Sequence, residues 1–249
     1  MNATMCLGII SAMPEEINNV LKNMSSVSSS IHGNRTFYKG LLFNKPVVLV
    51  FSNWGKVAAA TTATQLIQSF DINRLIFTGV AGALQEHLNI GDVVIGTHLY
   101  QHDMDARPFF KQFEIPIINK TDFKTNTTLT KSLEDATQSY LSSINIEDSL
   151  TSDFDITQPK LYKGGIASGD QFISDKEKIN ELNQSLPDAL CVEMEGAAVA
   201  QVCFDYKVDF GIIRTISDKA KDNASIDFQK FSANIASTYA LGILKHFLK

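Results

Sequence analysis

Apolar runs rich in β-branched residues alternate with stretches of helical periodicity along the whole chain. The apolar runs predict strands at residues 5–11, 36–43, 47–52, 74–78, 93–100, 161–167, 189–192 and 210–216. Two of these segments, PVVLVFS and FGIIRTIS, are apolar almost throughout, which is typical of strands that are covered on both faces. We therefore expect a sheet with helices on both of its sides.

The helical pattern predicts helices at residues 14–22, 56–69, 129–141, 176–182, 196–204 and 228–247. Pro14 suits the first turn of its helix, because it has no N–H to lose there. The last segment carries one apolar stripe at helical spacing, formed by Phe228, Phe231, Ile235, Tyr239, Ile243 and Phe247. Such a stripe is typical of a helix face that packs on the core.

The alternation of strands and helices predicts one α/β domain over residues 1–249, with a central mixed, largely parallel sheet flanked by helices. No internal repeat, low-complexity tract or linker interrupts the chain. The polar stretch 144–160 and the segment 107–120 are the predicted loops.

The composition excludes several classes of partner. The chain has 249 residues, 44% of them hydrophobic and 20% charged, as in ordinary globular proteins. A net charge of −5 without a basic stripe argues against nucleic acid or an anionic membrane surface as partner. No stretch reaches the roughly 20 apolar residues of a membrane span, and the first apolar run lacks the charged flank of a signal peptide. Cys6, Cys191 and Cys203 lie in apolar runs without a CxxC motif, which predicts buried free thiols and a cytoplasmic protein.

Acidic residues follow most of the predicted strands. Glu16 comes shortly after the first strand, Asp170 follows the strand at 161–167, Glu193 and Glu195 follow 189–192, and Asp218 follows 210–216. In open α/β sheets, ligands bind beyond the carboxyl ends of the strands. We therefore expect these acids to meet at one edge of the sheet.

An acid-lined pocket suits a neutral ligand rich in hydroxyl groups, or a transition state that develops positive charge. A polyphosphate site would require Lys, Arg and a glycine-rich loop instead, whereas Arg214 is the one strongly basic residue near these strand ends. Each acid also has a structural interpretation: Glu16 near a helix start could answer the helix dipole, and Asp170 could cap a turn or helix. Glu193 and Glu195 are harder to explain in that way, because their neighbours are apolar.

Other motifs are less specific. The GVAG segment at residues 79–82 lacks the full dinucleotide fingerprint, so no nucleotide cofactor is expected. The group His98, His102, Asp103 and Asp105 has only weak metal-ligand spacing, and no metal is expected. Trp54 could belong to the core or to a purine-stacking surface.

The chain resembles the 5′-methylthioadenosine/S-adenosylhomocysteine nucleosidases of the nucleoside phosphorylase superfamily. The segments that carry the resemblance span nearly the whole chain in family order: GIISAMPEE, GKVAAA, TGVAGAL with NIGDVVI, HDMDARPF, SGDQFI, VEMEGAAVAQVC and RTISDKA. VEMEGAA with a downstream R-x-I-S-D is highly specific. The resemblance implies hydrolysis of the N-glycosidic bond of 5′-substituted adenosines, with a nucleoside and water as the reacting partners.

The resemblance also implies roles for individual residues. Glu16 matches the residue that activates the attacking water, Asp218 the acid that protonates purine N7, and Glu195 the ligand of the ribose hydroxyls. Ser217 would orient Asp218, and Arg214 would help to hold the water network. The other implied substrate-binding residues are Met13, Ala81, Gly82, Phe172, Ile173, Met194 and Phe228. Phe109 resembles an aromatic residue that closes the neighbouring subunit's pocket, which implies a homodimer.

This assignment of roles agrees with the chemistry of the bond. Its cleavage builds positive charge on the ribose and negative charge on the departing purine, so one acid must arrive protonated and another ionised. Glu193 is interpreted as a supporting residue, paired with Arg214.

Two departures from the family pattern leave alternatives open. Val80 stands where relatives often have serine, and Trp54 where a small or aliphatic residue is common. The exact 5′ group is therefore open, and aminodeoxyfutalosine is an alternative substrate. Further alternatives are a phosphate-dependent purine nucleoside phosphorylase and a ligand-binding domain without activity.

Overall fold

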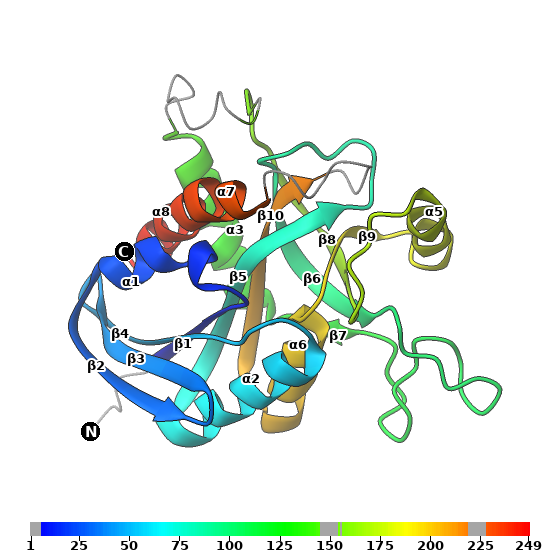
Figure 1. The fold of residues 1–249 in the computed structure, drawn as a ribbon, viewed down its shortest axis with the longest axis horizontal. Coiled ribbons are helices and arrows are strands. Elements are labelled where there is room, and N and C mark those ends of the chain that lie inside the picture. The colour runs from blue at the N-terminus through cyan, green and yellow to red at the C-terminus, as the bar shows by residue number, and fades with distance from the viewer. Residues whose placement is uncertain (1–5, 145–153, 155, 219–227) are drawn as a thin grey trace.

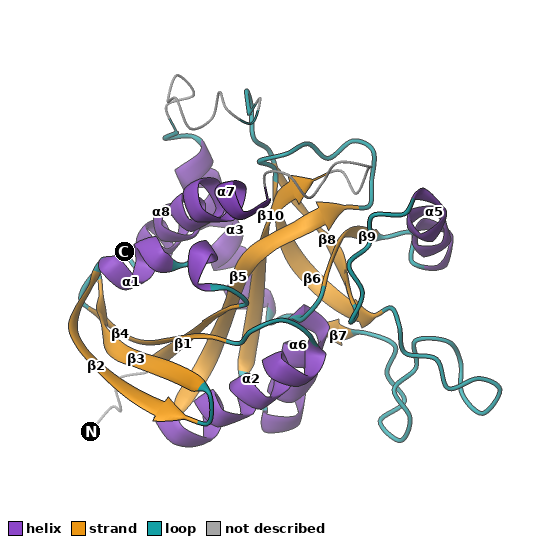
Figure 2. Ribbon diagram, viewed as in Figure 1, coloured by secondary structure: helices purple, strands orange, loops and turns teal. Residues whose placement is uncertain are grey.

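A mixed β-sheet forms the centre of the fold (Figures 1 and 2). The computed structural model describes residues 6–144, 154, 156–218 and 228–249. The strands are β1 (Cys6–Ser11), β2 (Met24–His32), β3 (Arg35–Leu42), β4 (Lys45–Phe51), β5 (Ile72–Ala83), β6 (Val93–Gln101), β7 (Phe123–Lys124), β8 (Leu161–Ser168), β9 (Ala189–Glu193) and β10 (Asp209–Asp218).

The long strand β5 organises the sheet, because it pairs with three other strands. It runs parallel to β1 through residues 72–77, then pairs with β9 through Gly82 and Ala83, and on its other edge it runs parallel to β10. The order β10-β6-β8-β9-β5, together with the β10–β5 pairing, closes a ring of five strands, and β1, β4, β3 and β2 extend from it. β1 and β9 thus leave a gap between them along β5, which is where a strand-end site is expected.

Two layers of helices cover the sheet. The helical elements are η1 (Pro14–Glu16), α1 (Asn18–Lys22), α2 (Lys56–Phe70), α3 (Thr127–Leu141), α5 (Lys176–Ser185), α6 (Gly196–Tyr206), α7 (Phe228–Phe231), η2 (Ser232–Ala236) and α8 (Ser237–Phe247). Helices α2 and α6 pack together on one face, and α1, α3 and α8 pack together on the other (Figure 1). Among the described helices, none has both the length and the apolar character needed to cross a bilayer.

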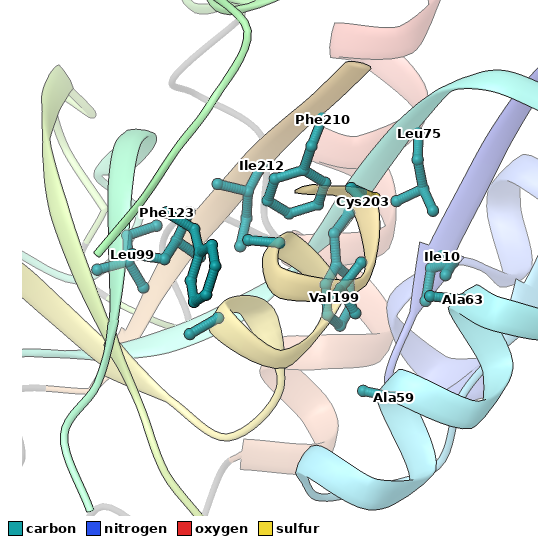
Figure 3. Close-up of a cluster of buried hydrophobic side chains, with 14 of the residues drawn as sticks. Ile10, Ala59, Ala63, Leu75, Leu99, Phe123, Val199, Cys203, Phe210 and Ile212 are labelled. Atoms are coloured by element: carbon teal, nitrogen blue, oxygen red, sulfur yellow. The ribbon is translucent and has the colours of Figure 1, made fainter. Parts of the chain in front are cut away.

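A cluster of buried side chains joins α2 and α6 to the sheet. Val199 and Cys203 of α6 lie between Ala59 of α2 and the β10 residues Phe210 and Ile212 (Figure 3). Short side chains on α2 and α6 allow the two helices to approach closely, because little volume separates their backbones. The first turns of both helices are thereby held beside the ends of β8 and β9.

The predicted elements are present, and four features differ from the prediction, one of which is the unpredicted two-residue strand β7. Strand β2 (MSSVSSSIH) was not predicted, because it is rich in serine and lies at the sheet edge, where Ile31 is 75% exposed. The predicted helix 14–22 consists of the 3-10 turn η1 and the short helix α1. The predicted last helix contains the π-helical turn η2 between α7 and α8. Its stripe packs on the core as expected, with Phe231, Ile235, Tyr239 and Ile243 buried. The side chain of Phe228 lies outside the described part of the structure.

Replacing a helical glycine by alanine usually stabilises a protein, but the contact between α3 and α8 should reverse this effect at Gly242. A Cβ atom at Gly242 of α8 would lie 2.0 Å from Cε2 of Tyr140 of α3. Gly→Ala within a helix ordinarily stabilises it by about 1 kcal/mol, but an added methyl group in a filled contact costs about 1–3 kcal/mol. We therefore expect Gly242→Ala to lower the free energy of unfolding by about 1 kcal/mol, measured by urea denaturation with circular dichroism.

The matched control is the same substitution in a Tyr140→Ala background. There the ring is gone, and Gly242→Ala should raise the free energy of unfolding through helix propensity alone. An equal effect of Gly242→Ala in both backgrounds would show that the Tyr140 contact does not set the sign.

Candidate active site

A cavity of about 370 Å³ opens where β1 and β9 separate along β5. Its volume is that of a small-molecule site. The lining residues come from the ends of β1, β4, β5, β8, β9 and β10 and the segments that follow them: Ala12, Met13, Glu16, Trp54, Val80, Ala81, Gly82, Gln171, Phe172, Ile173, Val192, Glu193, Met194, Glu195, Ser217 and Asp218. The predicted meeting of acids at one edge of the sheet is confirmed for four residues: Glu16, Glu193, Glu195 and Asp218.

Glu16 is fixed by four hydrogen bonds. Its Oε2 accepts from the hydroxyl of Ser11 at 2.5 Å and from the N–H groups of Ala12 and Met13 at 3.0 Å each. Its Oε1 accepts from the N–H of Val80 at 3.0 Å. Burial raises the pKa of Glu16, although the bond from Ser11, the charge of Arg214 and the backbone donors oppose the rise. The structure therefore leaves Oε1, with acceptor capacity remaining, as the atom that can take a further donor.

Glu193 is neutralised from within the protein. The guanidinium of Arg214 donates to its Oε2 at 2.6 Å, and both groups are buried. The N–H of Gly196 donates to both carboxylate oxygens, at 2.8 and 3.0 Å, and the hydroxyl of Ser168 donates to Oε1. Arg214 also lies over the ring of Phe77, with 4.1 Å between its Cζ and the ring centroid. The predicted pairing of Glu193 with Arg214 is confirmed.

Glu195 has far fewer partners than Glu193. It lies at the N-cap position of α6, and its Oε1 accepts from the N–H of Gly55 at 2.8 Å. Within the described part of the chain, this is the one hydrogen bond of its carboxylate. Burial and then the charge of Glu193 raise the pKa of Glu195 to about 8. Its Oε2 is therefore left for a donor from a ligand in the cavity.

A β-bulge in β10 positions Asp218. Ile216 pairs with Ala81 of β5 and Asp218 pairs with Gly82, so Ser217 is the extra residue in the ladder. A bulge of this kind redirects the side chains that follow it. The Ser217 hydroxyl donates to Oδ2 of Asp218 at 2.8 Å, as the predicted orienting role requires.

Two glycines of the GVAG segment let these acids lie against the backbone of β5. A Cβ at Gly79 would lie 2.7 Å from Oε1 of Glu16, and a Cβ at Gly82 would lie 3.0 Å from Oδ1 of Asp218. The first distance is too short for any side chain, so Gly79 is needed for the close approach of Glu16. The segment therefore forms the floor of an acidic cavity and not a phosphate-binding loop.

Apolar side chains form the rest of the wall. Ile173 is buried, whereas Phe172 and Trp54 line the cavity with 57% and 58% of their surfaces exposed. Met13 and Met194 are partly buried and complete the apolar lining. Aromatic rings exposed at a cavity can stack on a flat heterocycle.

The cavity lining is acidic without a cation. Among the described residues, no Lys, Arg or His lines it, and the guanidinium of Arg214 lies behind Glu193. An anion such as phosphate would meet the carboxyl groups of Glu16, Glu195 and Asp218, while the guanidinium of Arg214 is already paired with Glu193. A neutral ligand with hydroxyl groups, or one that becomes positively charged, fits this lining.

Several residues singled out in the sequence lie elsewhere. Asp170 accepts from the N–H of Lys56 at 2.7 Å, so it caps the start of α2 and does not line the cavity. Phe109 is 87% exposed on the loop between β6 and β7, which extends away from the sheet (Figure 2). Arg214 is close to the acids but lies outside the lining. The side chain of Phe228 lies outside the described residues.

The weak metal-ligand pattern is dispersed in the structure. His98 hydrogen-bonds Asp188 at 2.7 Å, Asp103 binds Lys56 at 2.6 Å, and Asp105 binds Arg107. Across the described ranges, no group of three or more His, Cys, Asp or Glu side chains is arranged to hold a metal ion.

Two contributors to the site were given no role in the sequence analysis, although Ser168 stands in the SGDQFI segment. Gly55 supplies the hydrogen bond to Glu195 from a helix start far away in the chain, and Ser168 binds both Glu193 and the N–H of Ala197, at 2.8 Å in the latter case. Gln171 also lines the cavity. Only the topology of the sheet brings these residues to the acids.

Known proteins are similar in sequence to this chain along nearly its whole length. Residues 7–249 match the phosphorylase superfamily. The 5′-methylthioadenosine/S-adenosylhomocysteine nucleosidase of Staphylococcus epidermidis is 34% identical over 241 residues, which cover 96% of this chain and 98% of that protein. The aminodeoxyfutalosine nucleosidase of Campylobacter jejuni is 36% identical over 242 residues, which cover 97% of each.

Solved structures share the fold. The 5′-methylthioadenosine/S-adenosylhomocysteine nucleosidase of Neisseria meningitidis, in complex with methylthio-immucillin-A, matches with a TM-score of 0.86 and 31% identity over 98% of both chains. The futalosine hydrolase of Helicobacter pylori matches with a TM-score of 0.85 and 31% identity over 98% of this chain and 97% of that one. These matches confirm the resemblance seen in the motifs. The chain therefore belongs to the phosphorylase superfamily and, within it, to the nucleosidases, which hydrolyse N-glycosidic bonds.

Proposed function

We propose that the enzyme hydrolyses 5′-substituted adenosines such as 5′-methylthioadenosine, S-adenosylhomocysteine and 5′-deoxyadenosine to adenine and the 5′-substituted ribose. The observation that carries this proposal is the division of the cavity acids. Glu16 is held by four donors, Glu193 is neutralised by Arg214, and Glu195 and Asp218 face the cavity. A nucleoside needs one acid at the base, one at the ribose hydroxyls and one at the attacking water.

Asp218 protonates N7 of the purine in this proposal. The departing base takes up the electron pair of the broken bond, and a proton at N7 removes the negative charge that would develop on the ring. Ser217 orients the carboxyl group through its hydroxyl. Phe172 and Ile173 enclose the ring, which stacks on Phe172 while backbone groups read its edge.

Glu16 activates the attacking water. Its Oε2 is saturated by three donors, so a water molecule can be bound and deprotonated only at Oε1. The raised pKa makes the ionised carboxylate a stronger base than an exposed glutamate. Arg214 acts on this step through its charge and through Glu193, and not by direct contact in the cavity.

Glu195 binds the ribose hydroxyls beside Met194. Its ionised form accepts a hydrogen bond from a ribose hydroxyl at Oε2 and stabilises the positive charge that develops on the ring as the bond to the base breaks. The N–H of Gly55 helps to hold that ionised form.

Water and not phosphate is the proposed acceptor of the ribose. The N–H of Val80, in the segment where a phosphorylase would hold phosphate, donates instead to Oε1 of Glu16. A phosphate ion at this place would lie against a carboxylate, which is unfavourable.

A second candidate substrate is aminodeoxyfutalosine. The nucleosidase of Campylobacter jejuni that acts on it is as similar to this chain as the methylthioadenosine nucleosidases. The same carboxyl groups would act on both substrates. The part of the cavity wall formed by Trp54 would distinguish the 5′ groups of the two substrates.

We also propose a cytoplasmic homodimer in which Phe109 closes the cavity of the neighbouring subunit. Phe109 is highly exposed and lies outside the lining of its own cavity, as an aromatic residue with this role must. The cysteines are free thiols, in agreement with a reducing compartment.

Loss of either acid should remove catalysis. We expect Glu16→Gln and Asp218→Asn each to reduce adenine release by roughly 10²- to 10⁴-fold, because each removes one proton transfer. Glu15→Gln on the same turn and Asp209→Asn at the start of β10 are the matched controls and should retain activity. The measurement is adenine release from methylthioadenosine without phosphate. Unchanged activity in the first two variants would contradict the proposal, as would a reaction that requires added phosphate and yields 5-methylthioribose 1-phosphate.

The buried carboxyl of Glu195 should make stability fall with pH. Its pKa is about 8 in the folded protein and about 4.3 in an unfolded chain. The folded state therefore holds this proton more tightly, and the stabilisation is complete below the unfolded value and lost as pH rises through the folded one. We expect the stability of Glu195→Gln relative to the natural enzyme to increase from about pH 5 to about pH 9, measured by urea denaturation without ligand. Parallel stability curves would contradict this expectation.

The side chain of Trp54 in the cavity wall should determine which 5′ groups the enzyme accepts. Trp54→Ala enlarges the cavity, and we expect it to raise kcat/KM for substrates with large 5′ groups, relative to methylthioadenosine, by roughly tenfold. The assay compares adenine release from methylthioadenosine, S-adenosylhomocysteine, 5′-deoxyadenosine and aminodeoxyfutalosine. The control is Val57→Ala, because Val57 is a neighbouring exposed residue that does not line the cavity. An equal change for every substrate would show that Trp54 does not contact the 5′ group.

A further inference from the structure

The start of helix α2 lies between two acids that come from different strand ends. The N–H of Gly55 donates to Oε1 of Glu195 at 2.8 Å, and the N–H of Lys56 donates to Oδ1 of Asp170 at 2.7 Å. Gly55 has a φ of 92°, and a Cβ there would lie 3.0 Å from Oδ1 of Asp170. The backbone of Gly55 is thus held in one orientation by its two acidic neighbours.

A further set of polar contacts fixes this arrangement from outside the cavity. The ammonium group of Lys56 binds Oδ1 of Asp103 at 2.6 Å and the side-chain oxygen of Gln101 at 3.2 Å. The other oxygen of Asp103 accepts from the N–H of Asp170 at 2.9 Å. Partial burial raises the pKa of Asp103, but the hydrogen bonds from Lys56 and Asp170 lower it overall, so the group is ionised near neutral pH.

These contacts connect four elements that border the site. Asp103 follows β6, Asp170 follows β8, Lys56 begins α2, and Glu195 precedes α6. Neither Lys56 nor Asp103 lines the cavity. Both side chains are only 19% exposed, so the ion pair is shielded from water more than a surface pair. The ion pair is connected to the cavity through the backbone of Gly55, whose N–H donates to Glu195.

We propose that Lys56, Asp103 and Asp170 are positioning residues for the ribose subsite, which hold the Gly55 N–H on Oε1 of Glu195 so that Oε2 is presented to a ribose hydroxyl. The inference rests on the proposed function, since it takes Glu195 as the ligand of the ribose. It assigns to these residues an effect on hydroxyl recognition and none on the protonation of the base.

The step from Lys56 to Glu195 follows from charge and geometry. Removal of the ammonium leaves Asp103 without its cation beside the backbone of Asp170, and the first turn of α2 loses its side-chain anchor. The Gly55 N–H can then turn away from Glu195. Glu195 would lose the hydrogen bond that favours its ionised form and fixes its direction.

The test deletes the ribose hydroxyls one at a time. Methylthioadenosine and its 2′-deoxy and 3′-deoxy analogues are compared in the natural enzyme, Lys56→Met, Asp103→Asn and Glu195→Gln, as kcat/KM for adenine release. We expect Lys56→Met to lower kcat/KM for methylthioadenosine by roughly tenfold, which is the scale of one hydrogen bond to a charged group. The same substitution should change kcat/KM for the analogue that lacks the bound hydroxyl by less than about twofold, because that contact is already absent.

Three further variants separate positioning from general damage to the fold. Lys56→Arg keeps the ion pair and should restore discrimination between the substrates. Lys131→Met breaks an exposed pair with Asp135 on α3 and should leave discrimination unchanged. In the Glu195→Gln background, Lys56→Met should have no further effect on discrimination.

Two pairs of outcomes would contradict different statements. An equal loss with all three substrates in Lys56→Met, or no loss at all, would overturn the positioning role while the proposed function stands. The absence of adenine release in the natural enzyme, or full hydroxyl discrimination in Glu195→Gln, would instead overturn the proposed function on which the inference rests.

Discussion

The ion pair between Glu193 and Arg214 is the interaction on which the rest of the cavity depends. It joins β9 to β10 across the ring of strands, and Ser168 of β8 and the first turn of α6 bind the same carboxylate. A buried ion pair adds little stability over an apolar substitute, but removal of one partner leaves an uncompensated charge that costs several kcal/mol. Without Arg214, the cavity would contain one more free carboxylate beside Glu195, and the electrostatic separation of the acids would be lost.

That separation gives each remaining acid a different environment. Glu16 is surrounded by donors, Glu195 accepts one backbone N–H, and Asp218 is oriented by the hydroxyl of Ser217. Pairs of carboxyl groups in unlike surroundings are the general means by which one site contains both an acid and a base at the same pH. The donors to Glu16 are mostly backbone groups, since Ala12 and Met13, between β1 and η1, and Val80 of β5 each supply an N–H. Burial by the fold is the largest cause of the raised pKa of both Glu16 and Glu195. Next come the hydroxyl of Ser11, which lowers the pKa of Glu16, and the charge of Glu193, which raises the pKa of Glu195.

The sequence predicts most elements of the fold, because the spacing of apolar residues and the presence of turn residues can be read from short segments of the chain. The sequence also indicates that the acids are functional, because Glu193 and Glu195 lie in an apolar run, where charged residues are rarely found without a partner. It does not reveal β2, whose serines lack a strand-like pattern, or the pairing of Gly55 with Glu195 across 140 residues. Asp170 looks like a site residue by its place after β8 and instead caps α2, because strand ends supply both ligands and helix caps. The residue types alone do not say which acid takes which role, and the roles stated for Glu16, Glu195 and Asp218 come from the resemblance of their motifs to the family.

The parting of β1 and β9 along β5 has a consequence for folding. The cavity exists only after β5 has paired with strands from both ends of the chain, since β1 precedes it and β9 and β10 follow it by more than a hundred residues. Such long-range pairings carry a high loop-closure cost and form late in folding. A chain in which these strands have not paired lacks the strand ends that line the cavity. Enzymatic activity is accordingly a direct measure of how much of a sample has completed its folding.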